Sequence, residues 1–471
     1  MFIQPVSFQA VKNEQFIFGA DVAAIADRAL CNNIFAEFWH GFCANASKIN
    51  FQPTNEHILI IGQAEVLPIP KNGYILQITK TGVSISAVDS QNLIYGFFAL
   101  LDNITTLETE SGKENFSIPC CTIQDEGAIK TRMIHLCIFP ETTLYFAQKF
   151  IRTAAFLRYT HIIIEFWGML QFDCLKALSW KNAFTKDDFR PLLQEAKALG
   201  LQPIPMFNHW GHATASRVRH GKHVVLDQAP ELAPLFDITG WNWNLENAKT
   251  KALHKQIRCE LIELFGGAYF HIGCDEAYGS LSEHDFNVVV DYINDVAAEL
   301  SNMGVKTIMW GDMLLYDAKS YAKETDNRYY ALAPSEEIQK LLMKKLSRSI
   351  LIADWQYEAK KFPIETALFF QNNGFEVFCC PFDFSLDCLS ASAKTVKEYN
   401  LNGIIHTTWH TLSAGMPMVG QMAVMAWEQA NAPHTHSYLT AYLASIIRKV
   451  CPVQGEYEHA GWSKVQIQDI T

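Results

Sequence analysis

Two adjacent carboxylates, Asp275 and Glu276, are the side chains of this sequence whose types and spacing best suit acid–base chemistry. They follow a short apolar run, residues 266–273, that is entered and left through glycine, as a buried strand of a parallel sheet would be. Neighbouring carboxyl groups in a partly dry site raise each other's pKa, so one can donate a proton while the other stays charged. That division of work suits cleavage of a glycosidic bond. The competing interpretation is a solvated Asp-Glu pair at a helix entrance, where the helix dipole favours negative charge.

A helix is expected directly after the two carboxylates. Ser280 and Glu283 have the spacing of a capping box. Apolar residues then recur at helical spacing, at Phe286, Val289, Val290, Ile293, Ala297 and Leu300. A strand that ends in acids and passes into a helix is the repeating unit of a β/α barrel, whose active sites form at the carboxyl ends of the strands.

The same alternation of strand and helix continues through residues 128–430. Eight apolar segments predict the strands: 133–139, 160–166, 202–207, 266–273, 305–310, 350–355, 375–380 and 403–408. We therefore predict an α/β fold in which a (β/α)8 TIM barrel, residues 127–432, follows a smaller α+β domain, residues 1–126. In the smaller domain the expected strands are 57–61, 74–79 and 83–87, and a helix opens at 89–92.

A helical extension, residues 433–471, completes the predicted organisation. Its apolar residues over 437–450 have helical spacing, so a final helix is expected there. This helix would pack on the barrel or on a second copy of the chain, which makes a homodimer a candidate assembly.

The residues at the predicted strand ends are of two kinds, aromatic rings and polar groups. They are Glu165, Trp167, Asn208, His209, His212, Asp275, Glu276, Trp310, Asp312, Asp354, Trp355, Tyr357, Trp409 and His410. A random scatter of the 11 Trp residues would seldom place one at so many strand ends. The pattern predicts an aromatic-walled pocket with polar groups at its floor, sized for one sugar ring. The competing interpretation is that each Trp only fills the mouth of the barrel.

The composition of the chain argues against some classes of binding partner. The net charge of -11 over 471 residues, without a basic run, argues against nucleic acid. No stretch approaches about 18 uninterrupted apolar residues, so no membrane partner is expected. The 12 Cys residues, several of them inside apolar runs, are typical of reduced core residues. We therefore expect a cytoplasmic location.

A metal site is a further chemistry that the sequence raises. His209 and His212 are three residues apart, and with His271 and Asp275 they form a conceivable ligand set for a metal-dependent hydrolase. No helix is expected to carry the His pair, which a common zinc motif requires. We therefore expect no metal and no cofactor.

The order of these motifs resembles the β-N-acetylhexosaminidases of glycoside hydrolase family 20. The central motif of that family, His-x-Gly-x-Asp-Glu, stands here as His271-Ile272-Gly273-Cys274-Asp275-Glu276. The hexosaminidase D branch is similar in further segments, at 162–166, at 204–212 and at 309–314. The resemblance covers nearly all of residues 128–430, and residues 74–101 look like the amino-terminal domain of the family.

The resemblance implies exo-acting hydrolysis with retention, in which the substrate's own 2-acetamido carbonyl attacks the anomeric carbon. Glu276 would be the general acid and then the base, Asp275 would hold the acetamido group, and His212 would orient Glu276. The implied substrate is a small carbohydrate or glycoconjugate ending in N-acetylglucosamine or N-acetylgalactosamine. The residues expected to bind it are Glu165, His212, Trp310, Asp312, Trp355, Tyr357 and Trp409.

Three positions depart from the pattern of the family. The arginine expected after the first strand is replaced near Phe139-Pro140, the His and Asp pair after the second strand gives way to Glu165-Phe166-Trp167, and the glutamate beyond Trp409 is Thr411. Glu165 is expected to take over recognition of sugar hydroxyls. The branch resemblance favours N-acetylgalactosamine, and the same departures keep open a catalytically silent carbohydrate-binding barrel.

Overall fold

The computed structural model describes residues 3–107, 115–214, 225–279, 282–322, 325–383, 385–409, 415–428 and 435–451. The chain forms two compact units, Met1–Asp125 with Ala441–Thr471, and Glu126–Thr440. The predicted extension 433–471 is therefore not a third unit. Within the described ranges, no helix combines the length and the apolar character needed to cross a membrane.

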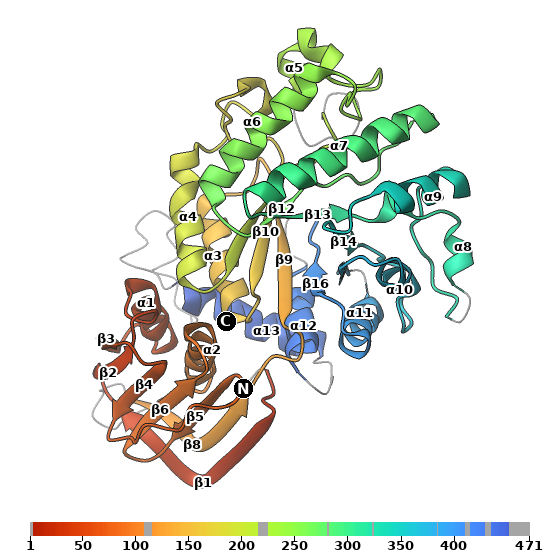
Figure 1. Ribbon diagram of the computed structural model, residues 1–471. Coiled ribbons are helices and arrows are strands. Elements are labelled where there is room, and N and C mark those ends of the chain that lie inside the picture. Colours follow the sequence, from red (N-terminus) through yellow and green to blue (C-terminus); the bar gives the residue numbers. More distant parts are fainter. Residues whose placement is uncertain are drawn as a thin grey trace, which may run out of the picture. The chain divides into compact units, whose positions relative to one another are not determined.

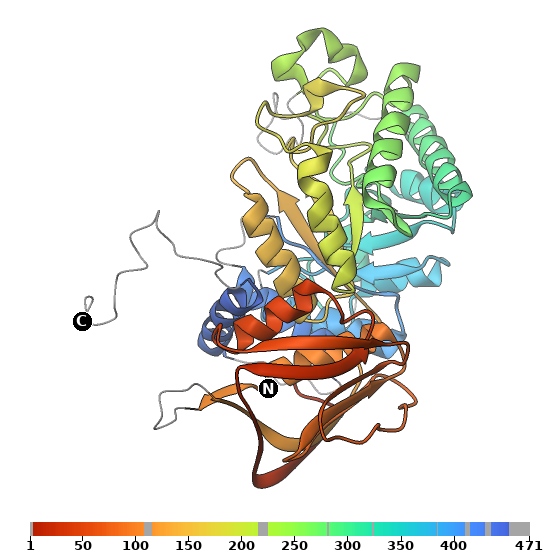
Figure 2. The same ribbon diagram turned by 90° about the vertical axis from the view of Figure 1, so that its left-hand side faces the viewer.

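The first unit is a mixed sheet with two helices on one of its faces (Figures 1 and 2). These two helices are α1 (Asn33–Phe42) and α2 (Ser90–Leu101). Its strands are β1 (Ser7–Phe18), β2 (Asp21–Asp27), β3 (Lys48–Thr54), β4 (Ile58–Gly62), β5 (Tyr74–Ile78), β6 (Gly82–Ala87), β7 (Thr105–Leu107) and β8 (Asn115–Asp125). The spatial order is β1-β8-β5-β6-β4-β2-β3, with β7 paired to β8. The predicted α+β class is confirmed, and β4, β5, β6 and α2 lie where the sequence predicts them.

The last helix, α13 (His436–Val450), forms where helical spacing predicts it. From Ala441 onward it belongs to the first unit, an arrangement outside the two that the sequence suggested. The Tyr442 hydroxyl donates to the Asp102 carboxylate over 2.8 Å at the end of α2. A Cβ atom added to Gly41 of α1 would lie 2.0 Å from the Lys449 carbonyl oxygen, so glycine permits this close helix contact.

The second unit is a closed barrel of eight parallel strands with its helices outside (Figure 1). The strands are β9 (Thr131–Ile138), β10 (His161–Phe166), β11 (Gln202–Met206), β12 (Tyr269–His271), β13 (Lys306–Trp310), β14 (Leu351–Asp354), β15 (Val377–Cys379) and β16 (Gly403–His406). The helices are α3 (Leu144–Phe156), α4 (Lys186–Ala198), α5 (Val225–Gln228), α6 (Ala248–Phe265), α7 (Glu283–Asn302), α8 (Ala318–Tyr321), α9 (Glu336–Lys345), α10 (Glu365–Asn372), α11 (Leu386–Tyr399) and α12 (Met416–Trp427). The predicted (β/α)8 TIM barrel is confirmed.

The helix that follows the two carboxylates starts later than the sequence suggested. Ser282 caps α7, and its side chain and that of Asp285 form a reciprocal capping box. Ser280, the predicted cap, lies outside the described residues. The displacement lengthens the segment between β12 and α7, and this segment carries Asp275 and Glu276.

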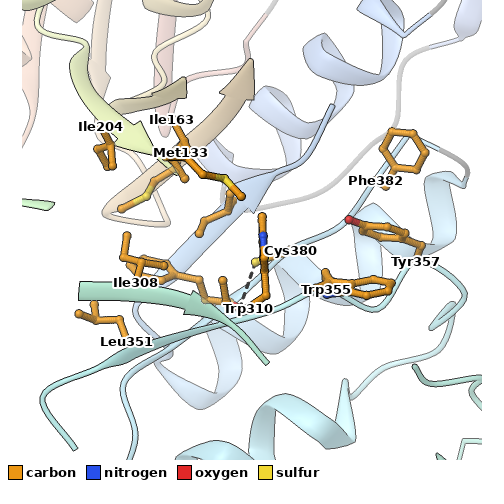
Figure 3. Packing of buried hydrophobic residues seen from close by; sticks show 14 residues of the cluster. Met133, Ile163, Ile204, Ile308, Trp310, Leu351, Trp355, Tyr357, Cys380 and Phe382 are labelled. Atoms are coloured by element: carbon orange, nitrogen blue, oxygen red, sulfur yellow. Dashed lines mark hydrogen bonds between the residues drawn. The ribbon is translucent and has the colours of Figure 1, made fainter. Parts of the chain in front are cut away.

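Alternation along the strands decides which side chains fill the barrel. Apolar residues such as Ile163, Ile204, Ile308 and Leu351 pack together inside it (Figure 3). Because successive side chains of a strand point to opposite faces, steps of two from these residues stay on the inner face. Those steps lead to Glu165, Asn208, Trp310, Asp312, Trp355 and Tyr357 at the carboxyl ends of the strands.

Candidate active site

The turn after β12 has an unusual backbone that sets the two carboxylates apart from a regular strand or helix. Gly273, Cys274 and Glu276 have φ values of 66°, 73° and 45°. A Cβ atom on Gly273 would lie 1.7 Å from the Asn208 side-chain oxygen, so only glycine fits there. That oxygen accepts the Cys274 N–H over 2.7 Å. Left-handed conformations of residues other than glycine cost roughly 1–2 kcal/mol each, so the surrounding contacts must hold this turn in place.

Asp275 is buried and held from two sides. The Asn208 amide donates to its Oδ1 over 2.9 Å. The His212 Nε2 atom lies 3.4 Å from its Oδ2. Its side chain is only 7% exposed, so its charge acts in a medium of low dielectric. The structure thus fixes this carboxylate in one orientation.

Glu276 shares the same histidine but is more exposed. The His212 Nε2 atom lies 3.2 Å from its Oε2, and its side chain is 30% exposed. Its backbone N–H donates to Asp312 over 2.9 Å, and the Trp241 indole donates to its carbonyl oxygen over 2.6 Å. The backbone of Glu276 is therefore clamped while its carboxylate can meet solvent or a ligand.

Asp312 is a third, fully enclosed carboxyl group beside this pair. Burial raises its pKa to about 8, and the nearby Asp275 charge adds to the shift. Its two oxygens accept the Glu276 N–H and the Trp355 indole N–H, the latter over 3.0 Å. Asp312 therefore links the turn that carries Asp275 and Glu276 to the Trp355 side chain through hydrogen bonds.

Aromatic side chains at or just beyond the ends of β13, β14 and β16 gather on the neighbouring wall, and Figure 3 labels Trp310, Trp355 and Tyr357 among them. The Trp310 and Trp409 ring centroids are 5.6 Å apart, and those of Trp355 and Tyr357 are 5.0 Å apart. The Trp409 indole donates to the Tyr357 hydroxyl, which joins the two pairs. The structure thus brings together the four aromatic residues that the sequence assigned to sugar binding.

The chain matches the model described as glycosyl hydrolase family 20, catalytic domain, over residues 167–442. That match covers more than half of the chain. The protein belongs to glycosyl hydrolase family 20. It is a glycoside hydrolase.

Similarity to individual known proteins is low in sequence, and for solved structures it is extensive in fold. The exo-β-N-acetylglucosaminidase of Vibrio harveyi, solved with N-acetylglucosamine, aligns with a TM-score of 0.68 at 15% identity over 96% of this chain and 78% of that one. The β-N-acetylhexosaminidase of Bacteroides fragilis gives 0.65 at 15% identity over 94% and 93% of the two chains. Lacto-N-biosidase of Bifidobacterium bifidum is 17% identical over 322 residues, 64% of this chain but 28% of the relative. The chain thus spans just over a quarter of that curated relative.

Glu165, predicted to bind sugar hydroxyls, lies in the wall of this family 20 barrel between β9 and β11. The Trp167 indole donates to its Oε2 over 3.1 Å, and the His135 Nε2 atom lies 3.6 Å from the same oxygen. Among the described residues, His135, Cys137 and Glu165 are the group whose potential metal-ligand atoms cluster, within 4.8 Å of one another. The Cys137 Sγ atom lies 3.8 Å from His135 Nε2, and its thiol donates to Glu165 Oε2 over 3.8 Å. The three side chains thus form a hydrogen-bonded set.

Two polar residues at the strand ends lie outside the site. His209 turns toward α6, where Arg258 donates to its Nε2 over 3.2 Å, and burial, with help from Arg258, lowers its pKa to about 3. Asp354 turns toward α10 and accepts the Thr366 hydroxyl over 2.6 Å. Both residues lie an odd number of positions from an inner-face residue of their strand, so their side chains point away from the inside of the barrel. The metal-ligand set of His209, His212, His271 and Asp275 is therefore not assembled, and His410 lies outside the described residues.

The structure gives roles to residues that the sequence left without one or did not name. Asn208, which the sequence places only among the strand ends, holds Asp275 and the turn. Trp241 and Tyr278 flank Glu276. The Trp241 indole donates to the Glu276 carbonyl oxygen, and the Tyr278 ring lies against Trp241, near enough to the Glu276 charge for that charge to raise its pKa. Trp241 lies in an irregular segment between η2 (Pro230–Leu235) and α6, where no periodic pattern points to a site.

Proposed function

We propose that this family 20 glycoside hydrolase is an exo-β-N-acetylhexosaminidase that works with retention and uses its substrate's acetamido group as the nucleophile. One observation carries the proposal. A single nitrogen, His212 Nε2, meets a buried Asp275 and a more exposed Glu276, which are neighbours on one turn. Adjacent carboxylates cannot flank a glycosidic bond from opposite faces, so a nucleophile from the substrate fits this arrangement.

The two acids have different roles in the first step of the reaction. The acetamido carbonyl oxygen attacks the anomeric carbon, the bond from that carbon to the glycosidic oxygen breaks, and Glu276 gives its proton to the departing oxygen. Asp275 accepts the acetamido N–H, which orients the carbonyl and offsets the positive charge of the oxazolinium ring. Holding the nucleophile in place contributes an effective-concentration gain.

The second step restores the enzyme. Glu276 takes a proton from water as the water oxygen attacks the anomeric carbon, and the oxazolinium ring opens to the acetamide. Two displacements at one carbon retain its configuration. Trp355, Tyr357 and Trp409, packed against the fully buried Trp310, supply the apolar wall that excludes water from the acetamido side, and the tyrosine hydroxyl can meet the carbonyl oxygen.

The sugar specificity is the finer part of the proposal. We place the chain near the hexosaminidase D branch and expect a preference for N-acetylgalactosamine over N-acetylglucosamine. Glu165 and Asp312 belong to the proposed substrate-binding set, Glu165 toward ring hydroxyls and Asp312 through Trp355. The acids are partnered by protein groups, so the chemistry needs no metal.

Hydrolysis of aryl β-glycosides tests this function. The wild-type protein should release nitrophenol from the N-acetylgalactosaminide and the N-acetylglucosaminide but not from the glucoside, which lacks the acetamido nucleophile. The Glu276→Gln variant should lose about 10²- to 10⁴-fold in kcat/KM. Equal rates on the glucoside would contradict substrate assistance. Binding of a thiazoline mimic without hydrolysis of any glycoside would instead identify a silent carbohydrate-binding barrel.

A further inference from the structure

Beside Glu276, on the outer part of its turn, lies a stack of aromatic rings that the cleavage chemistry above does not use. The His212 and Trp241 ring centroids are 4.4 Å apart, and those of Trp241 and Tyr278 are 5.8 Å apart with planes inclined by 22°. The outermost ring is the most accessible, because Tyr278 is 51% exposed. A large aromatic side chain left half-exposed beside reacting groups offers a flat surface to a ligand.

This stack is tied to the backbone of the general acid and lies close to its charge. The Trp241 indole donates to the Glu276 carbonyl oxygen over 2.6 Å. Burial and the negative charge of the nearby Glu276 carboxylate raise the pKa of the Tyr278 phenol. A group this close to the carboxylate that protonates the glycosidic oxygen lies close to whatever departs with that oxygen.

We propose that the exposed face of Tyr278, backed by Trp241, is the aglycone subsite, and that it binds the neutral sugar ring that leaves when Glu276 gives up its proton. The inference rests on the proposed function, since it takes Glu276 as the acid. The acetamido sugar is assigned to the wall of Trp310, Trp355, Tyr357 and Trp409, so the stack is an aromatic surface left for the second ring.

A hollow with a partly polar lining adjoins the stack through Asn242. The Asn242 amide nitrogen donates to the Tyr278 carbonyl oxygen over 2.7 Å. The Asn242 side-chain oxygen is buried and has no hydrogen-bond partner among the described residues. Asn242 also lines a half-open hollow of about 240 Å³ with Asp237, Asn244 and Glu246. Amides and carboxylates are acceptors for sugar hydroxyls, and the acidic residues disfavour an anionic aglycone.

A pair of substrates with the same acetamido sugar isolates this subsite. One is the methyl β-glycoside, whose aglycone has no ring, and the other is a β-linked disaccharide with a neutral second sugar. The measured quantity is the ratio of kcat/KM for the disaccharide to kcat/KM for the methyl glycoside. The Tyr278→Ala variant should lower this ratio roughly tenfold, mainly through the KM of the disaccharide, because only the disaccharide loses a stacking partner.

Two further variants distinguish the effect of losing the ring from the effect of losing its hydroxyl, and from a nonspecific effect of removing an exposed tyrosine. Tyr278→Phe keeps the ring, so the ratio should stay within about twofold of wild type. Tyr399→Ala removes another exposed tyrosine, 41% exposed at the end of α11, and should leave the ratio unchanged.

An unchanged ratio in Tyr278→Ala, or an equal fall in Tyr399→Ala, would overturn the subsite. Failure of the proposed function looks different, because the wild-type protein would then hydrolyse neither substrate.

Discussion

Asp275 and Asp354 are both buried carboxylates at the carboxyl end of a barrel strand, yet they face opposite sides of the wall. Asp275 meets Asn208 and His212 beside the aromatic wall. Asp354 meets Gln356 over 2.9 Å and Thr366 over 2.6 Å, on the side of α10. Their sequence contexts are alike, so residue type and position at a strand end do not by themselves make a site residue.

The difference follows from the phase of each residue relative to the core. Asp354 is three residues beyond Leu351, an inner-face residue of β14, and an odd step leads to the outer face. Asp275 lies beyond the end of β12, where left-handed residues at Gly273 and Cys274 redirect the chain. One acid therefore obeys the alternation of its strand, and the other depends on a special turn.

The comparison is tested most strongly by neutralising each acid in turn. Asp275→Asn should lower kcat/KM by on the order of 10²- to 10³-fold, because an amide cannot offset the positive charge that develops on the substrate. Asp354→Asn should change it less than twofold, because that side chain faces away from the aromatic wall. Steady-state kinetics with one aryl glycoside on both variants gives the two values. Similar losses in both would mean that orientation across the wall does not separate their roles.

Removing the partner that orients Asp275 should have a smaller effect. Asn208→Ala deletes the donor to Asp275 and the acceptor for the Cys274 N–H. We expect a fall of about 10- to 100-fold in kcat, with KM changing less, because the acid remains but loses its fixed orientation. Asn208→Asp, which keeps the acceptor but adds a charge next to Asp275, should be at least as damaging. Activity near wild type in Asn208→Ala would show that His212 alone positions the acid.

The fold and much of the site follow from the sequence because they depend on repeating patterns. Apolar strands and the helix opening at Asp89 predict the two units, and the run of strand ends places Trp310, Trp355 and Trp409 together. His209 and Asp354 were assigned to the strand ends without regard to phase, and counting by two from a core residue would have set them apart. Trp241 depends on an irregular connection, whose path is decided by tertiary contacts and leaves no periodic signal.

The smallest effect expected from this comparison is on stability, and it concerns Asp354. Burial raises the pKa of Asp354 to about 6, so between pH 4 and pH 6 the folded chain holds a proton that the unfolded chain releases. Stability from this group is therefore present at low pH, falls as the pH rises through that window, and stays lower above it. Asp354→Asn cannot ionise and should match wild type near pH 3.5 but melt a few °C higher at pH 7.5. Thermal unfolding of both proteins across this pH range gives the difference between their melting temperatures. Asp312 and the other acids titrate in both proteins, so their contributions cancel in that difference. A constant offset with pH would mean that Asp354 ionises as easily inside the fold as outside it.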